Sequence, residues 1–176
     1  MKCPFCDFCS DEMKKRIFYQ DEDWFAILAA PGHNKGHVLL TAVRKTSNCP
    51  TEPSLEVFSG LPKALWKAIQ AVKTVYQPKD VLLSSLRGSE SHFHFHSVLL
   101  YEDEEKVWRN SQKDKEGYRN GHLMEFLGYL EKQGDDRAKE ERRKSGLSEE
   151  QQRTKIVASQ KPEIEKLRIA VGYYSR

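Results

Sequence analysis

The chain has 176 residues, of which 38% are hydrophobic and 31% charged, and its formal net charge is +3. This length and this apolar content suit one folded domain with an appendage. The small net charge gives no argument for nucleic-acid or membrane binding, and no apolar run is long enough to cross a bilayer. The N-terminus has no apolar signal segment, so we expect a cytoplasmic protein.

The first hundred residues predict short strands around one main helix. Apolar residues spaced three and four apart from Leu55 to Tyr76 predict an amphipathic helix, divided near Gly60 and Pro62. Apolar runs bounded by turn residues predict strands at 16–20, 24–29, 37–43, 81–86 and 92–101. The first two form a hairpin. The pattern predicts an α+β fold, with a mostly antiparallel sheet of about five strands that packs on the helix.

The remainder of the chain has a different composition. Charges of both signs dominate residues 131–155, as in a solvated helix or a linker, and apolar residues return between Ile164 and Tyr174. We therefore predict two parts, a domain at 1–103 and a charged, largely helical C-terminal extension at 104–176. The apolar terminal segment is expected to dock back on the domain or on a partner.

Three of the four cysteines lie within the first nine residues. Cys3, Cys6 and Cys9 have C-x-x-C-x-x-C spacing, and the fourth cysteine is Cys49. In a reducing compartment such spacing favours a metal over a disulfide. One C-x-x-C supplies half of a tetrahedral zinc site, so Cys49 or a histidine must complete it. The alternative is that these cysteines are plain thiols in a loop.

The segment around which the chain is organised is His92-Phe93-His94-Phe95-His96. In a strand, successive side chains point to opposite faces, so the three histidines share one face and the two phenylalanines the other. A row of imidazoles can bind a metal, perform nucleophilic or acid–base chemistry, or hold an anion. The residues alone leave these alternatives open, together with a merely polar strand face.

These motifs together resemble the histidine triad (HIT) superfamily, and in particular its bacterial-type members. The resemblance covers roughly residues 1–101. Beside the triad, it rests on Cys3-Pro4-Phe5-Cys6, Tyr19-Gln20-Asp21 and Gly36-His37-Val38-Leu39-Leu40, in the order of the family. It implies a HIT-like fold and a nucleotide hydrolase or nucleotidyl or phosphoryl transferase acting on phosphate esters, phosphoramidates or anhydrides. The family commonly dimerises, so a homodimer is expected.

The resemblance also implies catalytic roles for single residues. His94, the middle histidine, would attack the α-phosphorus and form a covalent intermediate, while His96 would donate to the phosphate. Ser89 would contact the phosphate from the preceding turn, and Arg87 would supply a further contact. Ala29 stands where the family has the aspartate that grips the ribose, which points to an unusual nucleotide or another phosphate-containing small molecule as substrate.

A structural zinc ion is the cofactor that the resemblance implies. The first histidine of the triad, His92, is a ligand together with the Cys-x-x-Cys pair in zinc-carrying members. Lys45 stands where the family has its remaining histidine ligand, so Cys9 or Cys49 must take that position. With Cys49, the ligand set is Cys3, Cys6, His92 and Cys49.

Two other functions are compatible with the sequence. One is a non-catalytic nucleotide- or zinc-binding module that acts through a partner. The other is a metallo-enzyme in which His92, His94 and His96 bind one metal, because alternate residues of a strand can approach a single ion.

Overall fold

The computed structural model describes residues 3, 5–6, 11–29, 35–43, 51–85, 92–102, 136, 139–140 and 143–173. In chain order, its main elements are α1 (Asp11–Arg16), β1 (Ile17–Gln20), β2 (Trp24–Leu28), β3 (Val38–Ala42), α2 (Leu55–Ser59), α3 (Leu61–Tyr76), β4 (Asp80–Ser84), β5 (His94–Leu100) and α6 (Glu149–Tyr173).

The strands form one five-stranded sheet in the order β1-β2-β3-β5-β4, and each neighbouring pair is antiparallel. The predicted α+β fold, with an antiparallel sheet of about five strands and one main helix, is therefore confirmed. Gly60 ends α2 and caps the start of α3, as its position in the sequence predicts. Among the described residues, no helix is both long enough and apolar enough to cross a membrane.

Each face of the sheet has its own apolar cluster. Alternate strand residues such as Trp24 and Leu28 pack with α3 and α6 on one face. Phe93 and Phe95 pack against this same cluster, so the predicted orientation of the two phenylalanines is confirmed. The opposite face carries the cluster of Phe5, Ile17, Phe25 and Ile27. The histidines are therefore turned towards the face on which the N-terminal segment packs.

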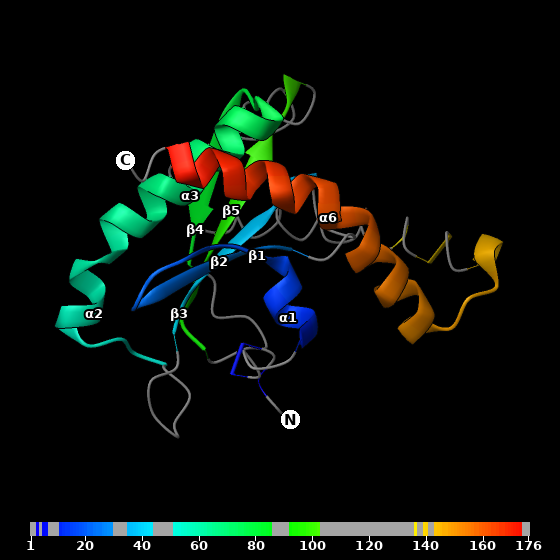
Figure 1. The fold of residues 1–176 in the computed structure, drawn as a ribbon, viewed down its shortest axis with the longest axis horizontal. Helices are drawn as coiled ribbons and strands as arrows, with labels where there is room; N and C mark the ends of the chain where they lie inside the picture. Colours follow the sequence, from blue (N-terminus) through cyan, green and yellow to red (C-terminus); the bar gives the residue numbers. More distant parts are fainter. Residues whose placement is uncertain are drawn as a thin grey trace, which may run out of the picture.

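Helix α6 docks on the domain, as the apolar character of its last turns predicts. Ile164 and Leu167 are fully buried in the cluster beneath α3. The Gln160 amide donates to the carbonyl oxygen of Ala29 at 2.8 Å, and Arg168 Nε donates to that of Ile17 at 3.0 Å. Figure 1 shows α6 crossing α3 and passing over α1 and β1. The helix thus covers β1, one of the two edge strands of the sheet, whose edge would otherwise be open to pairing.

Helix α1 is a difference from the sequence prediction, which has no helix before β1. It spans six residues, too few to show an apolar period, and its last turn is basic (Lys14, Lys15, Arg16), which suits a helix C-terminus. The Arg16 guanidinium donates to the carbonyl oxygen of Leu28 at 2.7 Å. The strand expected to begin at Arg16 therefore begins one residue later, at Ile17.

Replacing Tyr76 with phenylalanine should weaken the attachment of α6 to α3. The Tyr76 hydroxyl donates to the Glu163 carboxylate at 2.9 Å, and its loss should lower the free energy of unfolding at neutral pH by about 1 kcal/mol. Burial and this carboxylate raise the pKa of Tyr76 above its ordinary value of 10.0. The folded state then holds the phenolic proton more tightly than the unfolded chain, so stability is lost as the pH rises above about 10.

Denaturant titrations at pH 7 and at alkaline pH test this prediction. The loss of stability at alkaline pH should be smaller for Tyr76→Phe than for the natural chain. Glu163→Gln is the matched control, because it keeps a hydrogen-bond acceptor but removes the charge that opposes the phenolate. Equal alkaline losses in all three proteins would contradict the prediction.

Candidate functional site

Four histidines meet on the face of the sheet that α3 does not cover. Strand β5 pairs with β3 so that His96 lies opposite Leu39 and His94 opposite Thr41. His37 precedes β3 and has the same alternation as Leu39, which brings it beside His96. His92 lies two residues before β5 and is fully buried. His37 and His94 are each 6% exposed, so the imidazoles are largely shielded from water.

The imidazoles form a continuous chain of hydrogen bonds. Nε2 of His37 lies 3.1 Å from Nδ1 of His96, and Nε2 of His96 lies 3.0 Å from Nε2 of His94. Nδ1 of His94 lies 2.6 Å from the carbonyl oxygen of His92. Each of these hydrogen bonds needs one donor and one acceptor. The protonation of one ring nitrogen therefore decides which nitrogen of the next imidazole is protonated.

The carbonyl oxygen of His92 fixes where the protons lie. A carbonyl only accepts, so His94 carries its proton on Nδ1 and, when neutral, has a lone pair on Nε2. His96 must then donate from Nε2 to His94, and His37 from Nε2 to Nδ1 of His96. The site therefore holds one histidine with a fixed, unprotonated Nε2. The adjacent Nε2–H of His96 could equally donate to an oxygen of a bound phosphate.

His37 is a member of the site for which the sequence predicts no chemical role. Its signal in the sequence is the Gly36-His37 pair at the start of a predicted strand, which is one of the motifs of the family resemblance. Gly36 has φ +75°, and a Cβ there would lie 2.6 Å from Leu99 and 2.9 Å from Tyr76. Glycine is needed at this turn, and the turn delivers His37 to His96.

Replacing His37 with phenylalanine should leave His96 in the same tautomer. His94 should stay protonated on Nδ1 because its carbonyl partner remains, so its Nε2 still accepts the proton of His96 Nε2. Long-range ¹H–¹⁵N NMR of the imidazoles measures this directly. His37→Gln, whose amide can donate to Nδ1 of His96, should give the same tautomer. A mixture of His96 tautomers in the phenylalanine variant would contradict the assignment.

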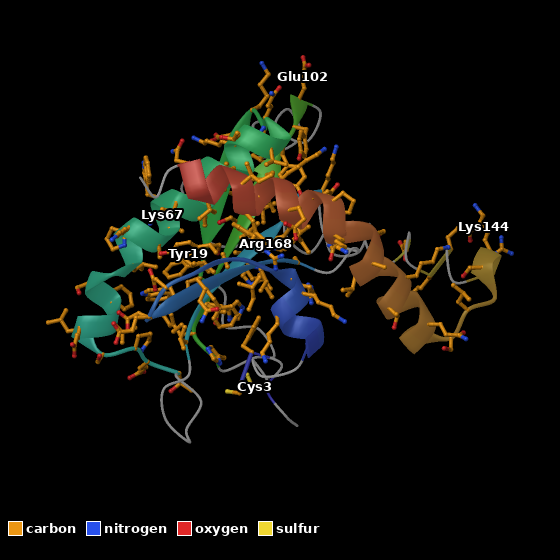
Figure 2. The ribbon with its side chains drawn as sticks, in the orientation of Figure 1. Cys3, Tyr19, Lys67, Glu102, Lys144 and Arg168 are labelled. Carbon is orange, nitrogen blue, oxygen red and sulfur yellow. The ribbon has the colours of Figure 1, made fainter. Side chains whose placement is uncertain are left out.

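A second cluster of donor atoms adjoins the first. Nδ1 of His92 lies 3.6 Å from Cys3 Sγ and 3.4 Å from Cys6 Sγ, and all three atoms lie within 4.8 Å of one another. Two ligands of a tetrahedral zinc, at about 2.3 Å for sulfur and 2.0–2.1 Å for nitrogen, are separated by about 3.5 Å. These residues form a cluster that could hold a metal. Figure 2 shows Cys3 beneath the strands, on the side away from α6.

The tautomer of His92 also fits a metal. Its Nε2 lies 2.8 Å from the carbonyl oxygen of Ala42, so this nitrogen carries the proton and Nδ1 presents its lone pair to the cysteines. In metal-binding histidines, the ring nitrogen that does not bind the metal commonly donates its N–H to a backbone carbonyl, which fixes the orientation of the ring. Both nitrogens of His92 are thus engaged, and the structure does not bring His92, His94 and His96 onto one metal.

Phe5 connects the two clusters. It stands between Cys3 and Cys6, and its ring centroid lies 5.5 Å from that of His92 and 5.0 Å from that of His94. A backbone hydrogen bond of 3.1 Å from Cys6 to Cys3 closes the turn that carries it. The Cys-x-x-Cys turn therefore places an aromatic cover on His94 as well as two sulfur atoms beside His92.

Of the other predicted site positions, the structure describes only that of Ala29. Ser89, Arg87 and Cys49 lie outside the described residues, so their roles stay predictions. Ala29 is buried, its amide donates to the carbonyl oxygen of His37 at 2.8 Å, and its own carbonyl accepts from Gln160. Helix α6 therefore contacts Ala29 through the Gln160 side chain.

No protein-family model and no curated protein matches this sequence. Solved structures of histidine triad proteins are similar to it. A hypothetical histidine triad nucleotide-binding protein from Sulfolobus tokodaii is 17% identical, with 76% of this chain and 93% of that chain covered and a TM-score of 0.49. A zinc-bound histidine triad family protein from Mycobacterium smegmatis is 20% identical (77% and 95% covered, TM-score 0.47). A HIT family protein from Bacillus anthracis is 23% identical (73% and 92% covered, TM-score 0.46). All three bear the name of the family that the sequence motifs resemble.

Proposed function

We propose that this protein is a histidine triad hydrolase or transferase that attacks a nucleotide phosphate through Nε2 of His94. The observation that carries the proposal is the 2.6 Å hydrogen bond from Nδ1 of His94 to the carbonyl oxygen of His92. It leaves the Nε2 lone pair available for attack, and neutral imidazole is an effective nucleophile near neutral pH. The burial of His94 under Phe5 keeps competing water away from this nitrogen.

The chemistry proceeds in two displacements. In the first, the lone pair of His94 Nε2 forms a bond to phosphorus while the bond from phosphorus to the leaving group breaks; the leaving group keeps the electron pair and takes up a proton from water. The substrate phosphate displaces the His96–His94 hydrogen bond, and the freed Nε2–H of His96 donates to the phosphate, where negative charge must be stabilised. In the second, water or another acceptor attacks the phosphorus and releases its proton to solvent, while the bond from phosphorus to Nε2 breaks and its electron pair returns to His94.

Other parts of the proposal concern binding. Ser89 and Arg87 contact the phosphate together with His96, and the substrate is a nucleotide or another phosphate-containing small molecule. With an alanine at position 29, no carboxylate is offered to a ribose there, which supports an unusual nucleotide. The protein is cytoplasmic and forms a homodimer.

Zinc is the proposed structural cofactor, and it would be held by Cys3, Cys6 and His92, with Cys49 as the fourth ligand. The donor set and the tautomer of His92 support this choice. When bound, the ion supplies rigidity, because it ties the N-terminal turn to the residue whose carbonyl oxygen orients His94.

A screen of nucleotide conjugates tests the proposal. Phosphoramidate, phosphate-ester and anhydride conjugates of several bases are incubated with the protein, quenched in alkali to preserve phosphohistidine, and examined by intact-protein mass spectrometry. At least one should leave a nucleotidyl or phosphoryl adduct that maps to His94 and is absent in His94→Asn. Binding of nucleotides without turnover or adduct would favour the non-catalytic module instead. An adduct on another residue would overturn the assignment of His94.

A further inference from the structure

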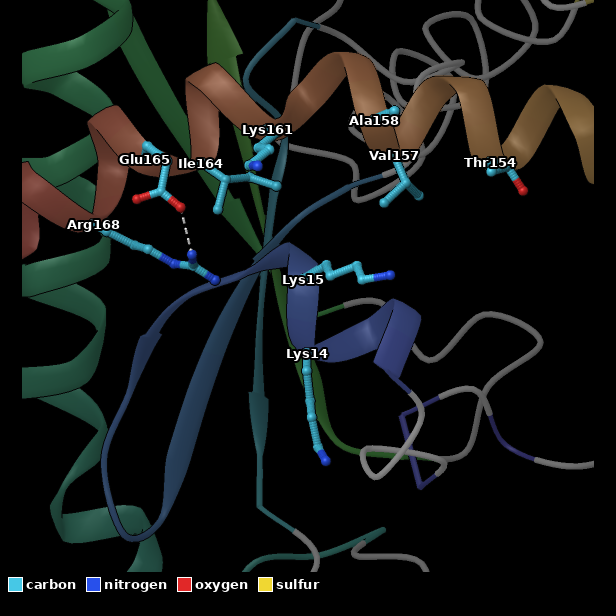
Figure 3. A pocket seen from close by; sticks show the side chains of 9 residues that line it. All are labelled: Lys14, Lys15, Thr154, Val157, Ala158, Lys161, Ile164, Glu165 and Arg168. Carbon is cyan, nitrogen blue, oxygen red and sulfur yellow. Dashed lines mark hydrogen bonds and ion pairs between the residues drawn. The ribbon is translucent and has the colours of Figure 1, made fainter.

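A basic groove runs between α1 and α6, on a part of the molecule that the histidine site does not use. Its volume is about 740 Å³. Figure 3 shows α6 above α1, with Val157 and Lys15 directed into the space between the two helices. The described residues that line it are Lys14, Lys15, Thr154, Val157, Ala158, Lys161, Ile164, Glu165 and Arg168.

The charge of the described lining is strongly one-sided. Among the described residues that line the groove, four side chains are cationic and one, that of Glu165, is a carboxylate. That carboxylate is already paired with Arg168, at 2.6 Å. The three lysines are exposed at its rim. Such a concentration of one sign attracts an anionic partner and raises its rate of association.

Arg168 is held in place in this groove. Its Nε donates to the carbonyl oxygen of Ile17 and its Nη1 to Glu165, so the guanidinium has a defined orientation. A second hollow of about 380 Å³ shares Arg168 and Lys14 with the first and continues along β1 towards Gln20. The two hollows therefore adjoin one another at Lys14 and Arg168.

The floor of the groove is apolar. Figure 3 shows Val157 and Ile164 on the side of α6 that faces α1, and Ala158 also lines the groove, so the groove offers methyl groups between its lysines. A free phosphate would leave the methyl groups of Val157 and Ala158 uncovered, and the described residues that line the larger hollow include no aromatic side chain on which a nucleic-acid base could stack. An amphipathic helix with an apolar stripe and acidic flanks can pack on the apolar side chains of the groove and pair with its lysines at the same time.

We propose that the α1–α6 groove is a docking site for an acidic amphipathic helix of a partner protein. The apolar stripe of that helix packs on Val157 and Ala158, and its carboxylates meet Lys14, Lys15 and Lys161. The site is separate from the histidines, so the proposal does not depend on the reaction assigned to His94. It gives the C-terminal helix a role in recognition as well as in the core.

The test uses the full chain and a fluorescein-labelled synthetic peptide of about four helical turns, with leucine at every third or fourth position and glutamate between. Its dissociation constant is measured by fluorescence anisotropy. Lys14→Glu/Lys15→Glu reverses the charge of the rim, and Ala158→Trp fills the groove without changing charge. The matched control is Lys63→Glu/Lys73→Glu, which makes the same charge change at exposed positions of α3.

Both groove variants should raise the dissociation constant on the order of tenfold or more, and the control by less than about twofold. Circular dichroism confirms folding, and Lys14→Gln/Lys15→Gln replaces the charge reversal if that variant does not fold. Absence of peptide binding, or equal weakening by the control, overturns the proposal. So does equal binding of a scrambled peptide of the same composition, which would make the floor irrelevant. Displacement of the peptide by a single-stranded oligonucleotide at lower concentration would identify a nucleic-acid site instead.

Discussion

Replacing His94 with asparagine should lower turnover of the best nucleotide conjugate by roughly three to four orders of magnitude, as expected for a lost nucleophile. The asparagine amide can still donate to the carbonyl oxygen of His92, so the strand should keep its geometry while the attacking nitrogen is gone. The Michaelis constant should change little, because the contacts that hold the phosphate belong to other residues. Steady-state kinetics with a purified conjugate measure both quantities.

His96→Ala is the comparison that separates attack from stabilisation. It removes the donor that faces His94, so turnover should fall by about a hundredfold, less than for the nucleophile, and the covalent adduct should still form. Unchanged turnover in His94→Asn would show that another group attacks the substrate. Equal losses in the two variants, with an adduct in neither, would leave covalent catalysis by His94 without support.

Removal of both N-terminal thiols should remove the metal and destabilise the protein. In Cys3→Ser/Cys6→Ser only His92 remains of the described cluster, and one imidazole does not hold zinc firmly. A bound ion present at about a thousand times its dissociation constant stabilises the folded state by about 4 kcal/mol. The variant should lose bound zinc in elemental analysis, and its midpoint of thermal unfolding should fall by several degrees.

A chelator should reproduce this loss in the natural chain but leave the cysteine variant unchanged. His94→Asn is the matched control, because it alters the neighbouring histidine and should keep its zinc. Zinc that survives the double cysteine change would place the metal elsewhere. Zinc that is lost in His94→Asn instead would favour a metal held by the triad.

The sequence predicted the features that depend on local alternation and spacing. A period of two in His92-Phe93-His94-Phe95-His96 is enough to place Phe93 and Phe95 against the helices and the histidines on the opposite face. Glycine at position 60 was enough to separate two helices, because its neighbours on each side keep a helical period. Such predictions succeed because side-chain direction in a strand or helix is set by the backbone itself.

Other features depend on segments that are far apart in the chain. The partnership of His37 with His96 spans 59 positions, and the docking of Gln160 on Ala29 spans 131. No local period contains such pairs, since they arise from the order of strands in the sheet and from the path of α6 across its edge. The short helix α1 is local in the chain, but the sequence does not predict it because six residues are too few to show a helical period.

The sequence by itself determined the chemical inventory: three imidazoles at alternate positions and a pair of thiols at the N-terminus. Only the tertiary structure decided which nitrogen of each imidazole carries the proton and which groups each histidine contacts. His92 presents Nδ1 to the cysteines because the carbonyl oxygen of Ala42 accepts the proton of its Nε2, whereas His94 presents Nε2 because the carbonyl oxygen of His92 accepts the proton of its Nδ1. Residue type states what a side chain can do, but its hydrogen-bond partners decide which nitrogen carries the proton, and those partners are brought together only by the fold.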